Sequence, residues 1–74
     1  MCRSIQTLRR QDIPTTQEEI EAAALQFVRK VSGYRKPSHL NRAAFEQAVA
    51  QVSAATTALL AELGVKLDIQ EESL

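Results

Sequence analysis

Two apolar series with helical spacing dominate this chain, and a glycine follows each of them. Gly33 closes the first and Gly64 the second, and glycine suits the left-handed backbone that ends many helices. Spacings of three and four residues build one apolar face at the 3.6-residue period of an α-helix. The first series is Ile20, Ala24, Phe27, Val28 and Val31, and the second is Phe45, Ala48, Val49, Val52, Thr56, Leu59, Leu60 and Leu63.

Capping signals precede the first series. Thr15 with Glu18 and Thr16 with Glu19 offer two overlapping capping boxes, in which a hydroxyl and a carboxylate satisfy backbone N–H groups of the first turn. Either box starts the helix within one residue. The sequence therefore predicts a first helix over residues 17–32.

A short connection separates the two series. Tyr34 to Pro37 forms it, because the residue before a proline is biased away from helical backbone. Ser38 is then a good N-cap, which predicts a second helix over residues 39–63. Short connections join antiparallel neighbours, so we predict an all-α fold, an antiparallel two-helix hairpin.

The predicted helices differ in length, at about 24 Å and about 37 Å for a rise of 1.5 Å per residue. The longer helix therefore extends beyond the shorter one. We expect an N-terminal extended arm, residues 1–15, and a second subunit to cover the overhang, so that a homodimer forms a four-helix bundle. The overhang carries Thr56, Leu59, Leu60 and Leu63, and the arm carries Ile5, Leu8 and Ile13.

Residues 65–74 are predicted to form an extended tail. Val65, Leu67 and Ile69 alternate with polar residues, as in a half-buried strand, but the sequence shows no second strand to pair with them. The tail either contacts the helices directly or exchanges as a strand between subunits.

At 74 residues the chain is predicted to form a single helical domain. Its lone cysteine, Cys2, cannot form an internal disulfide, and no apolar run approaches the roughly 18 residues of a membrane span. We therefore expect a cytoplasmic protein without a membrane partner.

Positive charge gathers in one stretch of the sequence, from Arg29 to Arg42, which holds no acidic residue. Lys and Arg total nine, as do Asp and Glu, so the formal net charge is zero. In an antiparallel hairpin this stretch lies at the loop end, where cations and a helix N-terminus together suit a phosphate or a carboxylate. The predicted anion-binding residues are Arg29, Lys30, Arg35, Lys36, Ser38 and Arg42.

The partner predicted from this charge is a phosphate-bearing ligand or an acidic protein, and the alternative is a solvated basic surface. Nucleic acid is disfavoured, because domains that bind it usually have a clearly basic balance. A further interpretation is a structural subunit that binds a partner helix along the Val52 to Leu63 face.

A thiol or metal function is a separate hypothesis. Removal of Met1 would expose an N-terminal Cys2, whose thiolate could bind a metal with help from His39. One cysteine and one histidine fall short of the four ligands of a structural zinc site. Because no catalytic constellation or phosphate loop is evident either, we expect no enzymatic activity and no cofactor.

The combined pattern resembles a family of small bacterial proteins, the domain of unknown function 2277 family, along most of the chain. The family supplies no activity or site residues, but the resemblance implies that Cys2, the Arg29 to Gly33 turn and the Lys36 to Ser38 segment belong to its pattern. The residues that carry it are Met1-Cys2-Arg3, Ile5, Pro14, Thr16, Glu18-Glu19, Ala24 to Gly33, Lys36-Pro37-Ser38, Asn41, Ala44-Phe45, Ala48-Val49 and Leu59-Leu60.

Overall fold

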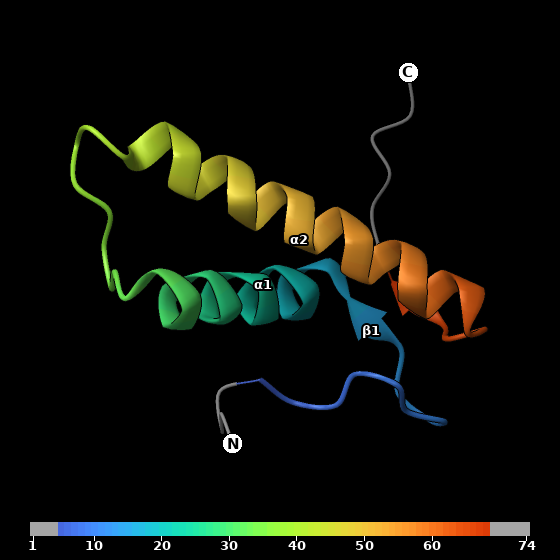
Figure 1. Cartoon of the computed structure of the whole chain (residues 1–74). Helices are drawn as coiled ribbons and strands as arrows, with labels where there is room; N and C mark the ends of the chain where they lie inside the picture. Colours follow the sequence, from blue (N-terminus) through green and yellow to red (C-terminus); the bar gives the residue numbers. More distant parts are fainter. Residues whose placement is uncertain (1–4, 69–74) are drawn as a thin grey trace.

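Two antiparallel helices lie side by side in the computed structural model, which describes residues 5–68 (Figure 1). In chain order the elements are β1 (Thr15–Thr16), α1 (Gln17–Ser32), α2 (Arg42–Glu62) and β2 (Leu67–Asp68). The predicted hairpin is present. The all-α prediction needs a correction, because β1 and β2 form a two-stranded parallel sheet that pairs Thr15 with Leu67 and Thr16 with Asp68.

The capping box of Thr16 and Glu19 starts α1 at the predicted residue. The Glu19 backbone N–H donates to the Thr16 hydroxyl at 3.1 Å, and the Thr16 N–H donates to the Glu19 carboxylate at 3.0 Å. Gly33 ends the helix with a φ of 78°, and its N–H donates to the Arg29 carbonyl. The predicted bounds of 17–32 agree with the structure.

The second helix begins three residues later than predicted, at Arg42 rather than at residue 39. Ser38 does not cap it; its hydroxyl and carbonyl accept from the Asn41 N–H and stabilise a turn that precedes the helix. Asn41 occupies the N-cap position without a capping side-chain bond, and its side-chain amide donates to the Tyr34 hydroxyl at 3.2 Å. The Ser38 hydroxyl, which would have capped an earlier helix start, therefore stabilises this turn instead.

A small core lies between the helices. From α1 it takes Ile20, Ala24 and Val28, which share one face at four-residue spacing, and from α2 it takes Phe45 and Leu60. Thr56 and Thr57 donate their hydroxyls to carbonyls one turn earlier in α2, so that their polar groups are satisfied within the helix.

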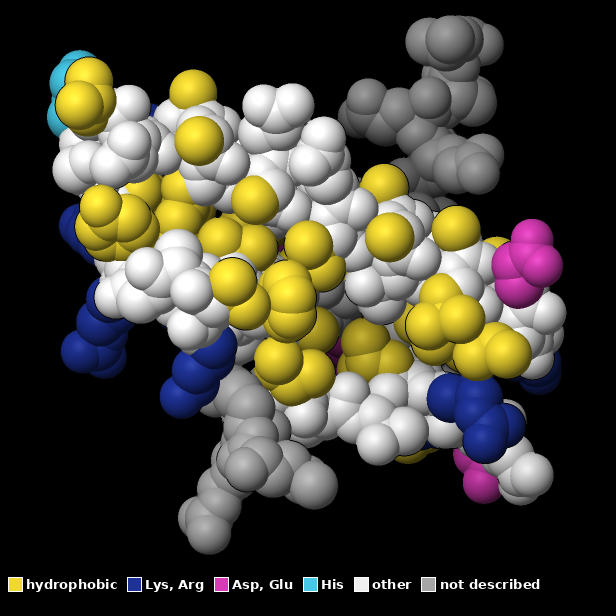
Figure 2. All heavy atoms as spheres, in the orientation of Figure 1, with side chains coloured by type: hydrophobic (Ala, Val, Ile, Leu, Met, Phe, Trp, Pro, Cys, Tyr) yellow, Lys and Arg dark blue, Asp and Glu magenta, His cyan; other side chains and the backbone are white. Residues whose placement is uncertain are grey.

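The arm before β1 covers part of the longer helix. Leu60 is buried and Leu8 is half-buried, whereas Leu59 and Leu63 keep more than half of their surface exposed. Ile5 and Ile13 are also exposed. Within the single chain, the predicted covering of the overhang is therefore only partial, and apolar atoms form a band across the face seen in Figure 2.

Thr15 ties the arm, β2 and α1 together. It is fully buried, its N–H donates to the Lys66 carbonyl at 2.9 Å, and its hydroxyl donates to the Leu8 carbonyl at 2.6 Å. The sequence indicated no strand partner for the tail, because two-residue strands separated by both helices leave no signal in the local pattern. Residues 69–74, the rest of the predicted tail, lie outside the described residues.

Arg10 fixes the arm on the start of α1. Its guanidinium donates to both Glu19 carboxylate oxygens, at 2.9 and 2.7 Å, and to the Pro14 carbonyl at 3.0 Å. The bonds from Arg10, followed by the one from the Thr16 N–H, lower the pKa of Glu19 from its usual 4.5 to about 2. The Glu19 carboxylate therefore stabilises both the start of α1 and the position of the arm.

Replacing the buried hydroxyl tests the role of Thr15. Thr15→Val keeps the side-chain shape but leaves the Leu8 carbonyl without its donor, so we expect the free energy of unfolding to fall by about 1 kcal/mol. Urea denaturation measures it, with Thr7→Val on the exposed part of the arm as the control. Equal stability of Thr15→Val and wild type would contradict this role.

Acid should loosen the arm through Glu19. Because the folded-state pKa of about 2 lies below the usual 4.5, the stabilisation is complete above pH 4.5 and is lost as the pH falls towards 2. Glu19→Gln should flatten the dependence of stability on pH in this window, as measured by urea denaturation at several pH values. Glu18→Gln, whose residue makes no bond to Arg10, is the control, and an unchanged slope in Glu19→Gln would refute the account.

Candidate functional site

The predicted cationic residues come together at the loop end of the hairpin. Arg29 and Lys30 lie in the last turn of α1, Arg35 and Lys36 in the connection, and Arg42 is the first residue of α2. Figure 2 shows Lys and Arg side chains projecting at this end of the molecule. We call these five residues the cationic loop end.

These cations are mostly solvent-facing. Arg29 is half-buried and the other four are exposed. The single ion pair between side chains of residues 5–68 joins Arg10 to Glu19, so no described carboxylate forms an ion pair with the cationic loop end.

The N-terminus of α2 adds backbone donors to the cationic loop end. Its first turn carries no acidic residue and Asn41 gives it no side-chain cap. The first helical hydrogen bond runs from the Phe45 N–H to the Asn41 carbonyl. The N–H groups of residues 42–44 therefore have no partner within the helix. A helix that began at the predicted residue 39 would have free N–H groups at His39 and Leu40, but these residues lie in the turn before α2.

Two predicted residues have altered roles. The Ser38 hydroxyl already accepts from the Asn41 N–H at 3.3 Å, although as a hydroxyl it still has a proton to donate. His39 is exposed in the same turn. Cys2, the other candidate metal ligand, lies outside the described residues, as does Met1.

No metal cluster or membrane span is evident in the described chain. Between Ile5 and Asp68, no three side chains of His, Cys, Asp or Glu are grouped so as to hold a metal ion. Within the same part, neither helix is sufficiently long and apolar to cross a membrane.

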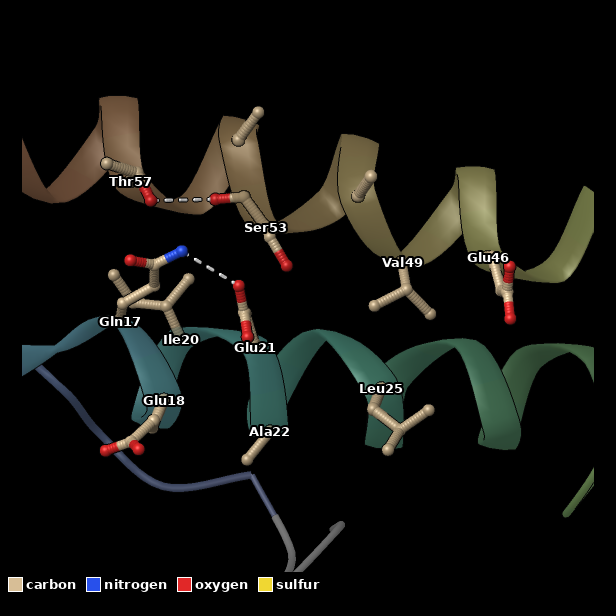
Figure 3. A pocket seen from close by; sticks show the side chains of 12 residues that line it. Gln17, Glu18, Ile20, Glu21, Ala22, Leu25, Glu46, Val49, Ser53 and Thr57 are labelled. Carbon is tan, nitrogen blue, oxygen red and sulfur yellow. Dashed lines mark hydrogen bonds between the residues drawn. The ribbon is translucent and has the colours of Figure 1, made fainter. Parts of the chain in front are cut away.

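A groove between the helices was not predicted from the sequence. It has a volume of about 730 Å³, and Figure 3 shows it from the side opposite to Figures 1 and 2, with Leu25 of α1 across from Val49 of α2. Glu18 and Glu21 line it from α1 and Glu46 lines it from α2, while no Lys or Arg does. The remaining lining residues are Gln17, Ile20, Ala22, Ala50, Ser53, Ala54 and Thr57.

The signal for this groove was present in the sequence as spacing. Glu21 and Leu25 are four residues apart on α1, and Glu46, Val49 and Ser53 are three and four apart on α2, so each set shares one helix face. The Gln17 amide donates to the Glu21 carboxylate at 3.0 Å across one helical turn. Periodicity locates such faces, but only the packing of the helices shows that they border one groove.

Comparisons with known proteins identify the family alone. Searches of curated proteins and of solved structures found no match. Residues 1–72 match the family described as "Uncharacterized conserved protein (DUF2277)", which agrees with the resemblance in the sequence. Since this match spans nearly the whole chain, the protein belongs to the DUF2277 family.

Proposed function

We propose that this protein is a non-catalytic helical interaction module whose cationic loop end binds an anionic group, carried by a phosphate-bearing ligand or by an acidic partner protein. The observation that carries the proposal is the gathering of five cations at one end of the hairpin with no described carboxylate in an ion pair with them. The proposed contacts come from Arg29, Lys30, Arg35, Lys36, Ser38 and Arg42.

The position of Arg42 supports an external anion. The N-terminus of a helix carries a partial positive charge, so a cation in the first turn is unfavourable there. Arg42 nevertheless opens α2, and no acidic residue of the first turn compensates for it. An anion bound between the free N–H groups and the Arg42 guanidinium would be attracted by both.

The chemistry favours a compact anion. Backbone N–H groups and guanidinium groups converge well on a phosphate or a carboxylate, whereas a nucleic-acid backbone needs a longer basic surface. The formal net charge of the whole chain is zero. We therefore propose a phosphate or carboxylate group as the ligand rather than a duplex or a single strand.

A partner helix is the second candidate function, supported by the apolar face in Figure 2. Phe27 and Val31 of α1 lie one helical turn apart, as do Leu59 and Leu63 of α2, and all four are exposed. Exposed apolar residues at this spacing are typical of surfaces that receive an amphipathic helix. We also propose that the protein acts as a homodimer with four helices.

Charge removal tests the anion site with a matched control. Lys36→Gln/Arg42→Gln should weaken binding of inorganic phosphate or pyrophosphate about fivefold, because it removes two charged contacts. Arg9→Gln/Lys66→Gln makes the same change at the opposite end of the hairpin, around Gly64, and should leave the affinity within about twofold.

Amide chemical shifts recorded during a phosphate titration provide the measurement. We expect the largest changes at the backbone amides of residues 35–44, and circular dichroism verifies that each variant keeps its helices. An equal loss of phosphate affinity in the two double variants would show that only the net charge of the protein matters, which would contradict a specific site. The absence of shift changes in this segment at millimolar phosphate would contradict it as well.

A further inference from the structure

The groove face carries a charge pattern that is complementary to itself. On α1, Glu21 lies four residues before Leu25 and Arg29 lies four residues after it. On α2, Glu46 lies three residues before Val49 and Ser53 lies four after it. Helical periodicity keeps each set on one face, so an acceptor and a donor flank the apolar centre of both helices.

Two of the donors lack partners within the chain. Among the described residues, the buried side-chain atoms without a hydrogen-bond partner are Arg10 Nε, Arg29 Nε and Ser53 Oγ. Ser53 lines the groove, and Arg29 lies beyond the lining residues, one helical turn after Leu25 on the same side of α1. Buried polar groups in native proteins nearly always find a partner. Both residues are only half-buried, so the part of each that stays exposed can face a second copy.

We propose that the groove face packs against the same face of a second copy, in an antiparallel arrangement about a two-fold axis at the level of Leu25 and Val49. These two side chains stand opposite each other across the groove in Figure 3. The two-fold operation places Arg29 of one copy against Glu21 of the other. On the second helix it places Ser53 of one copy near Glu46 of the other.

Small side chains permit this contact. Ala50 and Ala54 on α2 and Ala22 on α1 line the groove and are exposed, so the helices of two copies can approach closely. Leu25 and Val49, both half-buried, become the apolar centre of the interface. The result is a bundle of four helices in which each hairpin supplies one layer.

The direction of packing follows from the charged ends. A two-fold axis parallel to the helices would also bring Arg29 near a carboxylate, that of Glu46, but it would set the two cationic loop ends side by side. The antiparallel arrangement separates them and places each near the end of the partner where Glu18, Glu21 and Asp68 line one hollow, and where Arg9 and Lys66 also lie. Like-charge repulsion therefore selects the antiparallel form.

The inference rests on the homodimer of the proposed function and names its face, it shares Arg29 with the proposed anion site, and its test does not depend on an anion. Sedimentation equilibrium of the full chain measures the dimer dissociation constant. Glu21→Arg and Arg29→Glu, each of which sets like charges against each other, should raise it about tenfold. The double swap Glu21→Arg/Arg29→Glu should return it to within about threefold of wild type.

Controls keep the result interpretable. Glu62→Arg makes the same charge change at a residue that does not line the groove and should leave the dimer intact, while circular dichroism verifies the helices of every variant. A wild-type chain that stays monomeric, or a double swap that fails to restore the dimer, overturns the proposal. Dissociation by Leu59→Gln/Leu63→Gln but not by Glu21→Arg overturns it too, since the contact would then lie on the opposite face.

The antiparallel arrangement would be overturned if the double variant Glu46→Arg/Arg29→Glu restored the dimer and Glu21→Arg/Arg29→Glu did not. If Lys36→Gln/Arg42→Gln loses phosphate binding while its dimer dissociation constant stays unchanged, both proposals are supported. Absence of phosphate binding in wild type, with the charge swap behaving as expected, refutes the proposed anion site but not the proposed dimer.

Discussion

The packing of one helix on another buries only a single stripe of each, and this constraint governs the structure. Ile20, Ala24 and Val28 meet Phe45 and Leu60 in a core of few residues, while other large apolar side chains of both helices stay exposed. The arm and the two short strands extend this core, and Thr15 is where they join it. A chain of 74 residues has little else with which to cover its helices. This shortage supports the proposed association with a partner or with a second copy.

Charge is arranged along the hairpin rather than spread over it. The antiparallel connection brings the last turn of α1, the loop and the first turn of α2 to one end, and so converts a run of cations in the sequence into a cluster in space. Carboxylates line the groove and its far end, where α1 begins. The formal net charge is zero, yet five cations gather at one end, and this asymmetry is the basis of the proposed anion site and of the proposed dimer.

Local signals explain which parts of the fold could be predicted. The capping box of Thr16 and Glu19 and the glycine at position 33 act on their immediate neighbours, so α1 could be bounded to the residue. Ser38 gave the same kind of signal for the second helix, but its hydroxyl accepts from the Asn41 N–H and stabilises a turn that ends at Asn41, whose side chain donates to the Tyr34 hydroxyl. A sequence pattern does not distinguish a cap from a turn of this kind.

Features that depend on contacts between distant residues were beyond prediction. The pairing of Thr15 and Thr16 with Leu67 and Asp68 joins segments on either side of both helices, and neither strand is long enough to show alternation. The groove likewise depends on which faces of α1 and α2 meet. The cationic loop end could be predicted because it follows from connectivity alone, since the residues lie next to one another in the chain.

The most direct test of the account is a native mass spectrum of the untagged protein, purified from its own host. The account predicts a dimer that retains a phosphate-bearing or other anionic species, which is released as the salt concentration rises. A bare monomer, or a processed chain that carries a metal at Cys2, would contradict it and would move the search for function away from the helices.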